Sequence, residues 1–399
     1  MATMRTRIVL VLTAFAVTFA GLPAADARGR GVPASDPPVN PSASLLVTGE
    51  GYGHGRGMSQ WGAVNAAIQG KDYKTILKFY YPGTAFASVS ARLRVLITGD
   101  RDNNTTVKAA KGLSVYDFGS RKAYRLTKAT ARAWQLRTVQ GKTRVYYRTA
   151  KWHLYRTGGR VALKGIGEFR SSTGILVLRL PSGDRKYRGA LRFAGSDTVN
   201  VLSLENYLKG VVPAEMPAGW RPQALQAQAV AARSYALNKR DRFLSRYYQI
   251  CDTTACQVYK GVGVEDSRTN QAVAATAGQV LTYGGKPAFT EFSASSGGWT
   301  SAGDVPYLKA QQDIYSVADN DPYVPWSPEV RINTATLAKK YPQIGTLKKL
   351  QITTREGLGD WGGRVQTILL DGTAKDLVIS GDDFRSLYGL RSTLFKFGP

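Results

Sequence analysis

The hydrophobic pattern indicates a helical region in the middle of the chain. Residues 223–240 contain neither glycine nor proline and are rich in strong helix formers, and Pro222 suits the first turn of a helix. Small and large apolar side chains fall on separate edges of this segment, which favours close packing on a neighbour. The segment 63–81 also has helical spacing, and it ends at Pro82. Two helical stretches are therefore expected, far apart in the sequence.

Other parts of the chain alternate apolar and polar residues in the manner of β-strands. Leu93, Val95 and Ile97 recur at every second position, and similar patterns continue through the stretch 91–200. Short alternating segments return near the C-terminus. The sequence thus predicts an α+β fold, with a helical catalytic core around residues 202–241, a β-rich inserted domain and a β-rich C-terminal segment.

The first residues are typical of a secretory signal peptide. Residues 1–27 have a basic start, an apolar run and a small-residue cleavage site. The run is shorter than the roughly 20 residues of a membrane span, so we expect cleavage and no span afterwards. Residues 28–45 are rich in proline and serine and predict a linker. The other expected units are an N-terminal segment packing on the core (46–90), the β-rich domain (91–200), the core (201–326) and the C-terminal β-rich segment (327–399).

Composition adds a strong positive charge to this picture. The chain carries 54 Lys and Arg against 28 Asp and Glu, a formal net charge of +26. Such a balance favours a polyanionic partner, although charge kept only for solubility is an alternative. For an exported protein we expect anionic wall polymers and no nucleic acid, which export removes from reach. Cations and aromatic residues interleave from Trp134 to Tyr155, which suits sugars or polyanions, or simply the wet face of a sheet.

Glu215 is the leading candidate for a catalytic residue. Its neighbours from Val211 to Pro217 are otherwise apolar, and a helix start follows at Pro222. A carboxyl group in such surroundings loses hydration, which raises its pKa and lets it hold a proton near neutral pH, as a general acid must. The alternative is an ordinary carboxylate on a loop before a helix N-terminus.

A glycine-rich block, GYGHGRGMSQWGA at residues 51–63, is the second candidate. Its glycine density implies backbone that approaches something closely or takes positive φ, and it lacks the GxxxxGK[ST] spacing of a phosphate loop. His54, Ser59 and Gln60 are polar groups set among these glycines. They suit hydrogen bonding to sugar hydroxyls or support of an acid, and a structural turn capped by Ser59 is the alternative.

Further polar residues lie in the central helix and in the block FSASSGG at 292–298. Gln228 and Arg233 interrupt the apolar helix, either as donors to a ligand or as a satisfied core pair. Ser295 and Ser296 have no GxSxG elbow around them, so we expect them to bind a ligand or a loop and not to act as nucleophiles.

Cys251 and Cys256 are the only cysteines of the chain. Outside the membrane, two cysteines this close most simply form a local disulfide. That bridge would pin the turn that leads to Gln257 and Tyr259, which we include among the substrate-binding candidates.

Three blocks carry a resemblance to a known family. LENYLKGVVPAEMPAGW with the following ALQAQAVAARSYAL, the glycine-rich block and FSASSGG resemble motifs of the SpoIID/LytB family, named for stage II sporulation protein D and the amidase enhancer. The resemblance covers most of the chain from about residue 46 onward. In many relatives the glycine-rich block follows the Glu-bearing region, whereas here it comes first. This permuted order predicts that the block packs back against residues 202–300.

The resemblance implies a secreted, wall-associated lytic transglycosylase. Such an enzyme cleaves the β-1,4 bond between N-acetylmuramic acid and N-acetylglucosamine in peptidoglycan glycan strands, including strands stripped of stem peptides, and leaves a 1,6-anhydro end. If the C6 hydroxyl of the sugar attacks, Glu215 can act as acid and then as base, without the second carboxylate of ordinary glycosidases. Glu205 then has a supporting role.

The same resemblance implies an alternative function and raises the question of a metal. The alternative is a non-catalytic wall-binding protein that stimulates a separate amidase. Some relatives are zinc proteins that use two such cysteines and a histidine a few residues upstream. The stretch 242–250 offers no histidine, so the usual zinc set is incomplete and no cofactor is expected.

Overall fold

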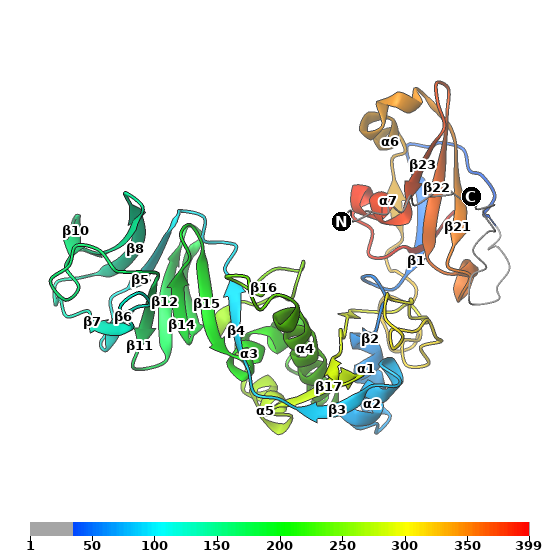
Figure 1. Cartoon of the computed structure of the whole chain (residues 1–399). Helices are drawn as coiled ribbons and strands as arrows, with labels where there is room; N and C mark the ends of the chain where they lie inside the picture. Colours follow the sequence, from blue (N-terminus) through cyan, green and yellow to red (C-terminus); the bar gives the residue numbers. More distant parts are fainter. Residues whose placement is uncertain (1–34, 399) are drawn as a thin grey trace, which may run out of the picture.

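The structure is a computed structural model that describes residues 35–398. The expected signal peptide and the beginning of the expected linker lie outside the described residues. Figure 1 shows three parts arranged in an arc, with a group of helices between two β-rich parts. The described chain contains helices and several separate sheets, so the predicted α+β fold class is confirmed.

Helix α4 is the centre of the helical part. It starts at Pro222, as the sequence predicts, and its side chains are buried from Ala224 to Leu237. Helices α1, α2, α3 and α5 all pack against it. The helical spacing at 63–81 corresponds to two helices, because Gly70 takes a φ of 80° between them. The bounds are α1 (Gln60–Ile68), α2 (Tyr73–Tyr80), α3 (Leu204–Glu215), α4 (Pro222–Arg242) and α5 (Ser267–Ala275).

The inserted domain contains two antiparallel sheets. One has the strand order β10-β9-β8-β5-β12-β13, and the other has the order β16-β4-β15-β14-β11-β6-β7, in which only β16 runs parallel to its neighbour. The bounds are β4 (Arg92–Leu96), β5 (Asn104–Lys108), β6 (Leu113–Asp117), β7 (Lys122–Arg125), β8 (Ala133–Val139), β9 (Lys142–Arg148), β10 (Trp152–Tyr155), β11 (Gly167–Ser171), β12 (Ile175–Leu180), β13 (Gly183–Arg188), β14 (Ala190–Phe193), β15 (Thr198–Ser203) and β16 (Ile250–Cys251).

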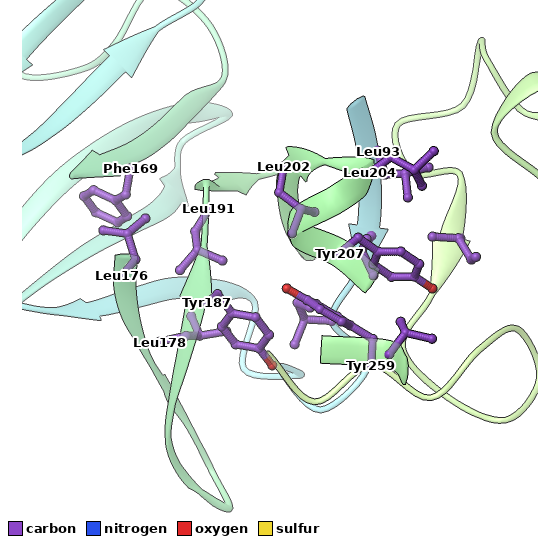
Figure 2. Packing of buried hydrophobic residues seen from close by; sticks show 14 of the residues in the cluster. Leu93, Phe169, Leu176, Leu178, Tyr187, Leu191, Leu202, Leu204, Tyr207 and Tyr259 are labelled. Atoms are coloured by element: carbon purple, nitrogen blue, oxygen red, sulfur yellow. The ribbon is translucent and has the colours of Figure 1, made fainter. Parts of the chain in front are cut away.

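One apolar core joins the inserted domain to the helices. Phe169 and Leu191 from one sheet pack with Leu178 from the other, and the same cluster continues to Tyr207 on α3 and to Tyr259 (Figure 2). Burying side chains of this size stabilises a fold by roughly 1.5–3 kcal/mol each. The β-rich domain is therefore packed directly on the region that carries Glu215.

The N-terminal segment pairs with strands from the later part of the chain. Strand β1 (Leu45–Glu50) lies between β20 (Val330–Ile332) and β24 (Leu394–Phe397). Strand β2 (Met58–Ser59) pairs in parallel with β19 (Phe292–Ser293), and β3 (Ala85–Ser88) pairs with β17 (Gln279–Tyr283), which also pairs with β18 (Lys286–Pro287). This segment therefore contacts both the helical part and the C-terminal part.

The C-terminal part is a three-stranded sheet covered by two short helices. The strands are β21 (Leu347–Arg355), β22 (Val365–Gly372) and β23 (Leu377–Ser380), the helices are α6 (Ala335–Lys340) and α7 (Gly381–Tyr388), and short 3₁₀ turns lie at Pro342–Ile344 and Asp360–Gly362. A further 3₁₀ turn, Gly261–Val264, packs on α3 and β13 instead. Residues 35–44 of the expected linker are packed on this part, because Val39 bridges to Leu350 and Asp36 pairs with Arg355. Within residues 35–398, no helix is long and apolar enough to cross a membrane.

Candidate active site

A cavity of about 210 Å³ lies beside the C-terminal end of helix α3. Its walls come from segments that are far apart in the sequence: the glycine-rich block, the C-terminal end of α3, the α4 residue Tyr235, the loop after β16, and the start of β19 with the residue before it. The lining residues are His54, Glu215, Tyr235, Thr254, Cys256, Gln257, Val258, Glu291 and Phe292.

Glu215 is the last residue of α3, not a loop residue before a helix start, which corrects the local structure expected from the sequence. Its Oε1 accepts a hydrogen bond from the Val258 backbone N–H at 2.9 Å. Burial raises the pKa of Glu215 above its ordinary 4.5, and the Val258 hydrogen bond and the charge of Lys260 only partly oppose this. The negative end of the helix dipole also favours the protonated carboxyl. Glu215 is thus suited to donate a proton.

Glu291 is a second carboxylate in the same cavity. The Arg56 guanidinium donates two hydrogen bonds to it, from Nε to Oε2 and from Nη2 to Oε1, both at 2.9 Å. Burial alone would raise the pKa of Glu291, but the hydrogen bonds and charge of Arg56 outweigh it and hold the pKa below its ordinary value. The two carboxyl groups are therefore shifted in opposite directions, which is the pattern of an acid and an ionised partner.

His54 is a neutral hydrogen-bond donor in this cavity. Burial lowers its pKa to about 4, and the charge of Arg56 adds to the effect. The Nδ1 atom accepts a hydrogen bond from the Arg56 backbone N–H at 3.0 Å, so the ring proton of the neutral imidazole is on Nε2. His54 and Arg56 also line a second cavity, of about 240 Å³, whose other walls include Val365 and Asp382 of the C-terminal part.

The glycine-rich block fits tightly against the strand that carries Glu291. Strands β2 and β19 pair in parallel, and Tyr52 bridges to Ser295. Gly57 has a φ of 67°, and a Cβ atom there would lie 2.0 Å from the backbone oxygen of Glu291. Only glycine allows this close approach. The block thus brings His54 and Arg56 to the cavity.

Comparison with known proteins identifies the segment around Glu215. Residues 193–283 match the family model SpoIID, described as stage II sporulation protein. This stretch is therefore similar to the SpoIID family, and we call it the SpoIID region. The SpoIID region supplies Glu215, Tyr235 and the loop 254–258 to the cavity, whereas His54 and Glu291 come from outside it.

Several proteins are similar over a longer stretch than the SpoIID region. The amidase enhancer of Bacillus subtilis is 41% identical over 152 residues, which is 37% of this chain and 18% of that protein. Stage II sporulation protein D of Bacillus subtilis is 31% identical over 232 residues, or 51% of this chain and 62% of that protein. The protein of the same name from Bacillus amyloliquefaciens is 29% identical over 229 residues, or 50% and 61%. The chain thus spans less than two thirds of each of these relatives.

The structure places Ser59, Gln60 and Gln228 away from the cavity walls. The Ser59 hydroxyl caps helix α1, since its Oγ accepts from Gly62 N at 3.1 Å, and it also accepts from Ser296 N. Gln60 Nε2 donates to Gln228 Oε1 at 3.4 Å, and both side chains are buried between α1 and α4. These three residues hold the glycine-rich block on the SpoIID region. The contacts of Ser59 and Gln228 are thus those of the structural alternatives expected for them, and none of the three residues lines the cavity.

Arg233 is committed to the fold in the same way. Its guanidinium is fully buried, donates two hydrogen bonds to Glu205 at 2.9 and 2.8 Å, and donates a further one to the Gln279 carbonyl at 3.0 Å. Glu205 also accepts from Gly278 N. We therefore assign Arg233 to packing and not to substrate, while Glu205 has the supporting position expected for it.

Of the two substrate-binding candidates after the disulfide, one lines the cavity and the other lies in the apolar core. Gln257 lines the cavity, held by Tyr207 and by the Ala232 carbonyl. Tyr259 belongs to the apolar core, with its hydroxyl on Asn200 Oδ1 at 2.8 Å (Figure 2). Tyr259 is thus a packing residue and not a substrate contact.

Ser295 and Ser296 bind two buried aspartates instead of facing the cavity. Ser295 Oγ donates to Asp321 at 2.6 Å, and Ser296 Oγ donates to Asp313 at 2.7 Å. Burial raises the pKa of Asp313 to about 6, against the opposing effect of the Ser296 hydrogen bond. This network fixes the backbone after β19, so the contacts seen for both serines are the loop hydrogen bonds that were one of their two expected roles.

The two cysteines are joined to each other. Cys251 and Cys256 form a disulfide with a Cα–Cα distance of 5.5 Å. The zinc set of some relatives therefore does not fit this site, because neither sulfur is a thiolate. Within the described residues, no group of three or more His, Cys, Asp or Glu side chains is placed to hold a metal ion.

Sequence reasoning missed Glu291 and its arginine. Glu291 stands in FTEFSASSGG between Phe289 and Phe292, so it is a carboxylate with bulky apolar neighbours, the same local signal that singled out Glu215. Tyr235 was also missed, and it lines the cavity while stacked on Phe289 at 5.1 Å. What no local pattern indicated is the pairing of Glu291 with Arg56, 235 positions away.

Proposed function

We propose that this protein is a secreted lytic transglycosylase that cleaves the glycan strands of peptidoglycan, with Glu215 as acid and base. The observation that carries the proposal is the buried carboxyl of Glu215, with a raised pKa, in the wall of a cavity. Similarity to stage II sporulation protein D and to an amidase enhancer places the proposal in a cell-wall context.

The reaction needs one proton donor that is later restored. Glu215 gives its proton to the glycosidic oxygen as the bond from that oxygen to C1 of N-acetylmuramic acid breaks. The C6 hydroxyl of the same sugar then forms a bond to C1, and its proton passes to the Glu215 carboxylate. The products are a 1,6-anhydro end and a free hydroxyl on the neighbouring sugar, and Glu215 is again protonated.

Glu291 supplies fixed negative charge in this scheme. Positive charge develops at C1 as the glycosidic bond breaks, and an ionised carboxylate whose side chain is only 15% exposed stabilises it. Arg56 keeps Glu291 ionised and holds its orientation through two hydrogen bonds. Glu291 is therefore the second residue on which the rate should depend.

His54 and the adjoining cavity suit a long substrate. The Nε2–H of the neutral imidazole can donate a hydrogen bond to a sugar oxygen. Because His54 lines both cavities, neighbouring sugars of one strand can occupy the two cavities, with the His54 side chain between them.

A second candidate function is supported by the amidase enhancer of Bacillus subtilis, which is 41% identical over 152 residues. In that case the protein binds the wall, stimulates a separate amidase and breaks no glycosidic bond. Glu215 then matters for the fold or for binding only.

Mass spectrometry of digested peptidoglycan distinguishes the two. Purified protein is incubated, with no amidase present, with intact and with peptide-stripped peptidoglycan, beside Glu215→Gln and the exposed control Glu329→Gln. Anhydro-muramyl ends that vanish only in Glu215→Gln support the proposal. Reducing ends instead would assign hydrolysis, with Glu291 as the base for water. No fragments from any sample, with wall binding retained, would favour the enhancer.

A further inference from the structure

Strand register places four cations on one face of the six-stranded sheet. Residues directly opposite each other in an antiparallel pair lie on the same face, as do alternate residues along a strand. Arg137 is opposite Arg144, and Lys142 and Arg148 follow at alternate positions of β9. The residues between them, Trp134, Leu136 and Val145, are buried in the core on the other face. We call Arg137, Lys142, Arg144 and Arg148 the basic face.

The cations of the basic face have no acidic partner among residues 35–398. Arg137 lies over the Tyr146 ring at 3.7 Å, Arg148 lies 5.8 Å from the Trp152 ring, and Arg144 donates to Gln140 at 2.9 Å. The Nε atoms of Arg137 and Arg144 have no hydrogen-bond partner in the described chain. Their positive charge is therefore held in place but not neutralised.

In the other sheet of this domain, by contrast, two arginines are neutralised by an acidic partner. There, Arg170 and Arg192 both pair with Glu168, at 2.8 Å each. Residues 91–200 as a whole contain 24 Lys and Arg against six Asp and Glu, so this domain holds +18 of the net charge of +26. Most of the charge that distinguishes the chain thus lies in a domain that contributes no residue to the cavity at Glu215.

We propose that the basic face binds a linear phosphodiester polymer of the cell wall, of the polyol phosphate type. This inference uses the cell-wall context of the proposed function but does not depend on catalysis. Alternate residues of β9 are about 6.6 Å apart, so Arg144 lies one such step from Lys142, and Arg148 lies two steps, about 13 Å, beyond Arg144 on the same line. The six backbone bonds of a glycerol phosphate unit equal those of two peptide units, so an extended chain repeats about every 7 Å and its phosphates can meet charges that are one or two steps apart.

The central aromatic residue of this face, Tyr146, argues against single-stranded nucleic acid as the occupant, while Trp152, opposite Arg148 on the edge strand β10, is only partly exposed. Proteins that hold single strands stack bases on exposed aromatic rings. Tyr146 is covered by Arg137 and is only 8% exposed, so its ring is not available for stacking. The face offers charge and hydrogen-bond donors, which suit a polymer whose recognised groups are phosphates.

The experiment measures binding to walls and to one defined polymer. The purified protein is sedimented with intact walls, with walls whose phosphodiesters have been removed by hydrofluoric acid, and titrated with poly(glycerol phosphate) at low salt. The test variant combines Arg137→Gln, Lys142→Gln, Arg144→Gln and Arg148→Gln. A second variant changes only the exposed Lys142 and Arg148, in case the four changes impair folding. The control combines Lys339→Gln, Lys340→Gln, Lys349→Gln and Lys375→Gln, which removes the same charge from exposed positions of the C-terminal part.

We expect the fourfold variant to bind the polymer roughly 30-fold more weakly, because each exposed ion pair contributes a factor of a few to the affinity. On a logarithmic scale, the loss of affinity in the double variant should be about half as large. Removing the wall phosphodiesters should weaken the wall binding of the unchanged protein to the level of the fourfold variant. Equal losses in the control would show that net charge alone is responsible and would overturn the proposal. Equal affinity for intact and stripped walls, or at least tenfold tighter binding to single-stranded DNA of equal phosphate number, would overturn it as well.

Discussion

The cavity and the basic face use charged side chains in opposite ways. At the cavity Glu291 has a fixed partner in Arg56, and in the helical part beside it the buried Arg233 pairs with Glu205. On the basic face four cations have no acidic partner in the described chain. Fixed pairs that are largely buried set protonation states, whereas unpaired exposed charges attract a polyelectrolyte and are screened by salt. The chemistry and the wall attachment should therefore respond to different mutations.

The change Glu291→Gln should produce the largest difference between the effects on catalysis and on polymer binding. Loss of this charge should lower kcat on peptidoglycan fragments by about 10²- to 10³-fold, because it removes electrostatic stabilisation that is needed only in the transition state. Binding to poly(glycerol phosphate) should not change. The measurement is the rate of anhydro-end formation for Glu291→Gln and for the fourfold basic-face variant. On short soluble fragments the fourfold variant should keep its kcat, although its binding to poly(glycerol phosphate) is weakened. Wild-type kcat in Glu291→Gln would remove this residue from the mechanism.

Glu205→Gln should lower the free energy of unfolding more than any other single change proposed for this protein. It leaves the fully buried guanidinium of Arg233 without its charge partner, which costs about 3 kcal/mol in the free energy of unfolding. Chemical denaturation measures the change. Asp184→Asn is the matched control, since this carboxylate pairs with Lys108 at the surface, and we expect its midpoint to equal that of the unchanged protein. Equal midpoints for both variants would contradict the structural role assigned to Arg233.

Removal of the disulfide should affect only the cavity. The double change Cys251→Ser and Cys256→Ser frees the loop that carries Gln257 and Val258, and the expected loss of stability is at most about 2 kcal/mol because the closed loop is short. The Val258 N–H that binds Glu215 would then be less well placed, so kcat should also fall. Thermal unfolding and kcat are measured together, and unchanged polymer binding is the control.

The pH profile should give the most gradual effect. Glu291 must be ionised and has a lowered pKa, so the rate should rise with pH below 4.5. Glu215 must be protonated and has a raised pKa, so the rate should fall as pH passes above 4.5 through its own pKa. Each limb should change the rate about tenfold per pH unit. Glu291→Gln should lose the acidic limb and keep the alkaline one. A Glu215→Gln profile with an unchanged alkaline limb would contradict the assignment.

Sequence reasoning succeeded where the deciding signal is local. Helix α4 follows from the absence of glycine and proline in 223–240, and the alternation at Leu93, Val95 and Ile97 gives the β-rich domain. The burial of Glu215 follows from its apolar neighbours. Each of these depends on residues within one turn or one strand of each other.

The parts that sequence reasoning did not reach depend on pairing across the chain. The ion pair of Arg56 and Glu291 exists because β2 and β19 pair in parallel, and no periodicity specifies which distant strands meet. The same holds for Ser295 and Ser296, whose hydroxyls are used by Asp321 and Asp313. A polar residue in a motif looks identical in sequence whether it faces a ligand or a buried partner.

The course of the chain after β1 has a consequence for how this protein can be divided. Strand β1 is held between β20 and β24, and within a few residues the same chain delivers His54 and Arg56 to the cavity. A fragment cut to residues 193–283 would keep Glu215 but lose Glu291 and the arginine that keeps it ionised. The unit that evolution or an engineer could transplant is therefore the interwoven chain, from its first strand to its last, and not the segment that matches the SpoIID family model.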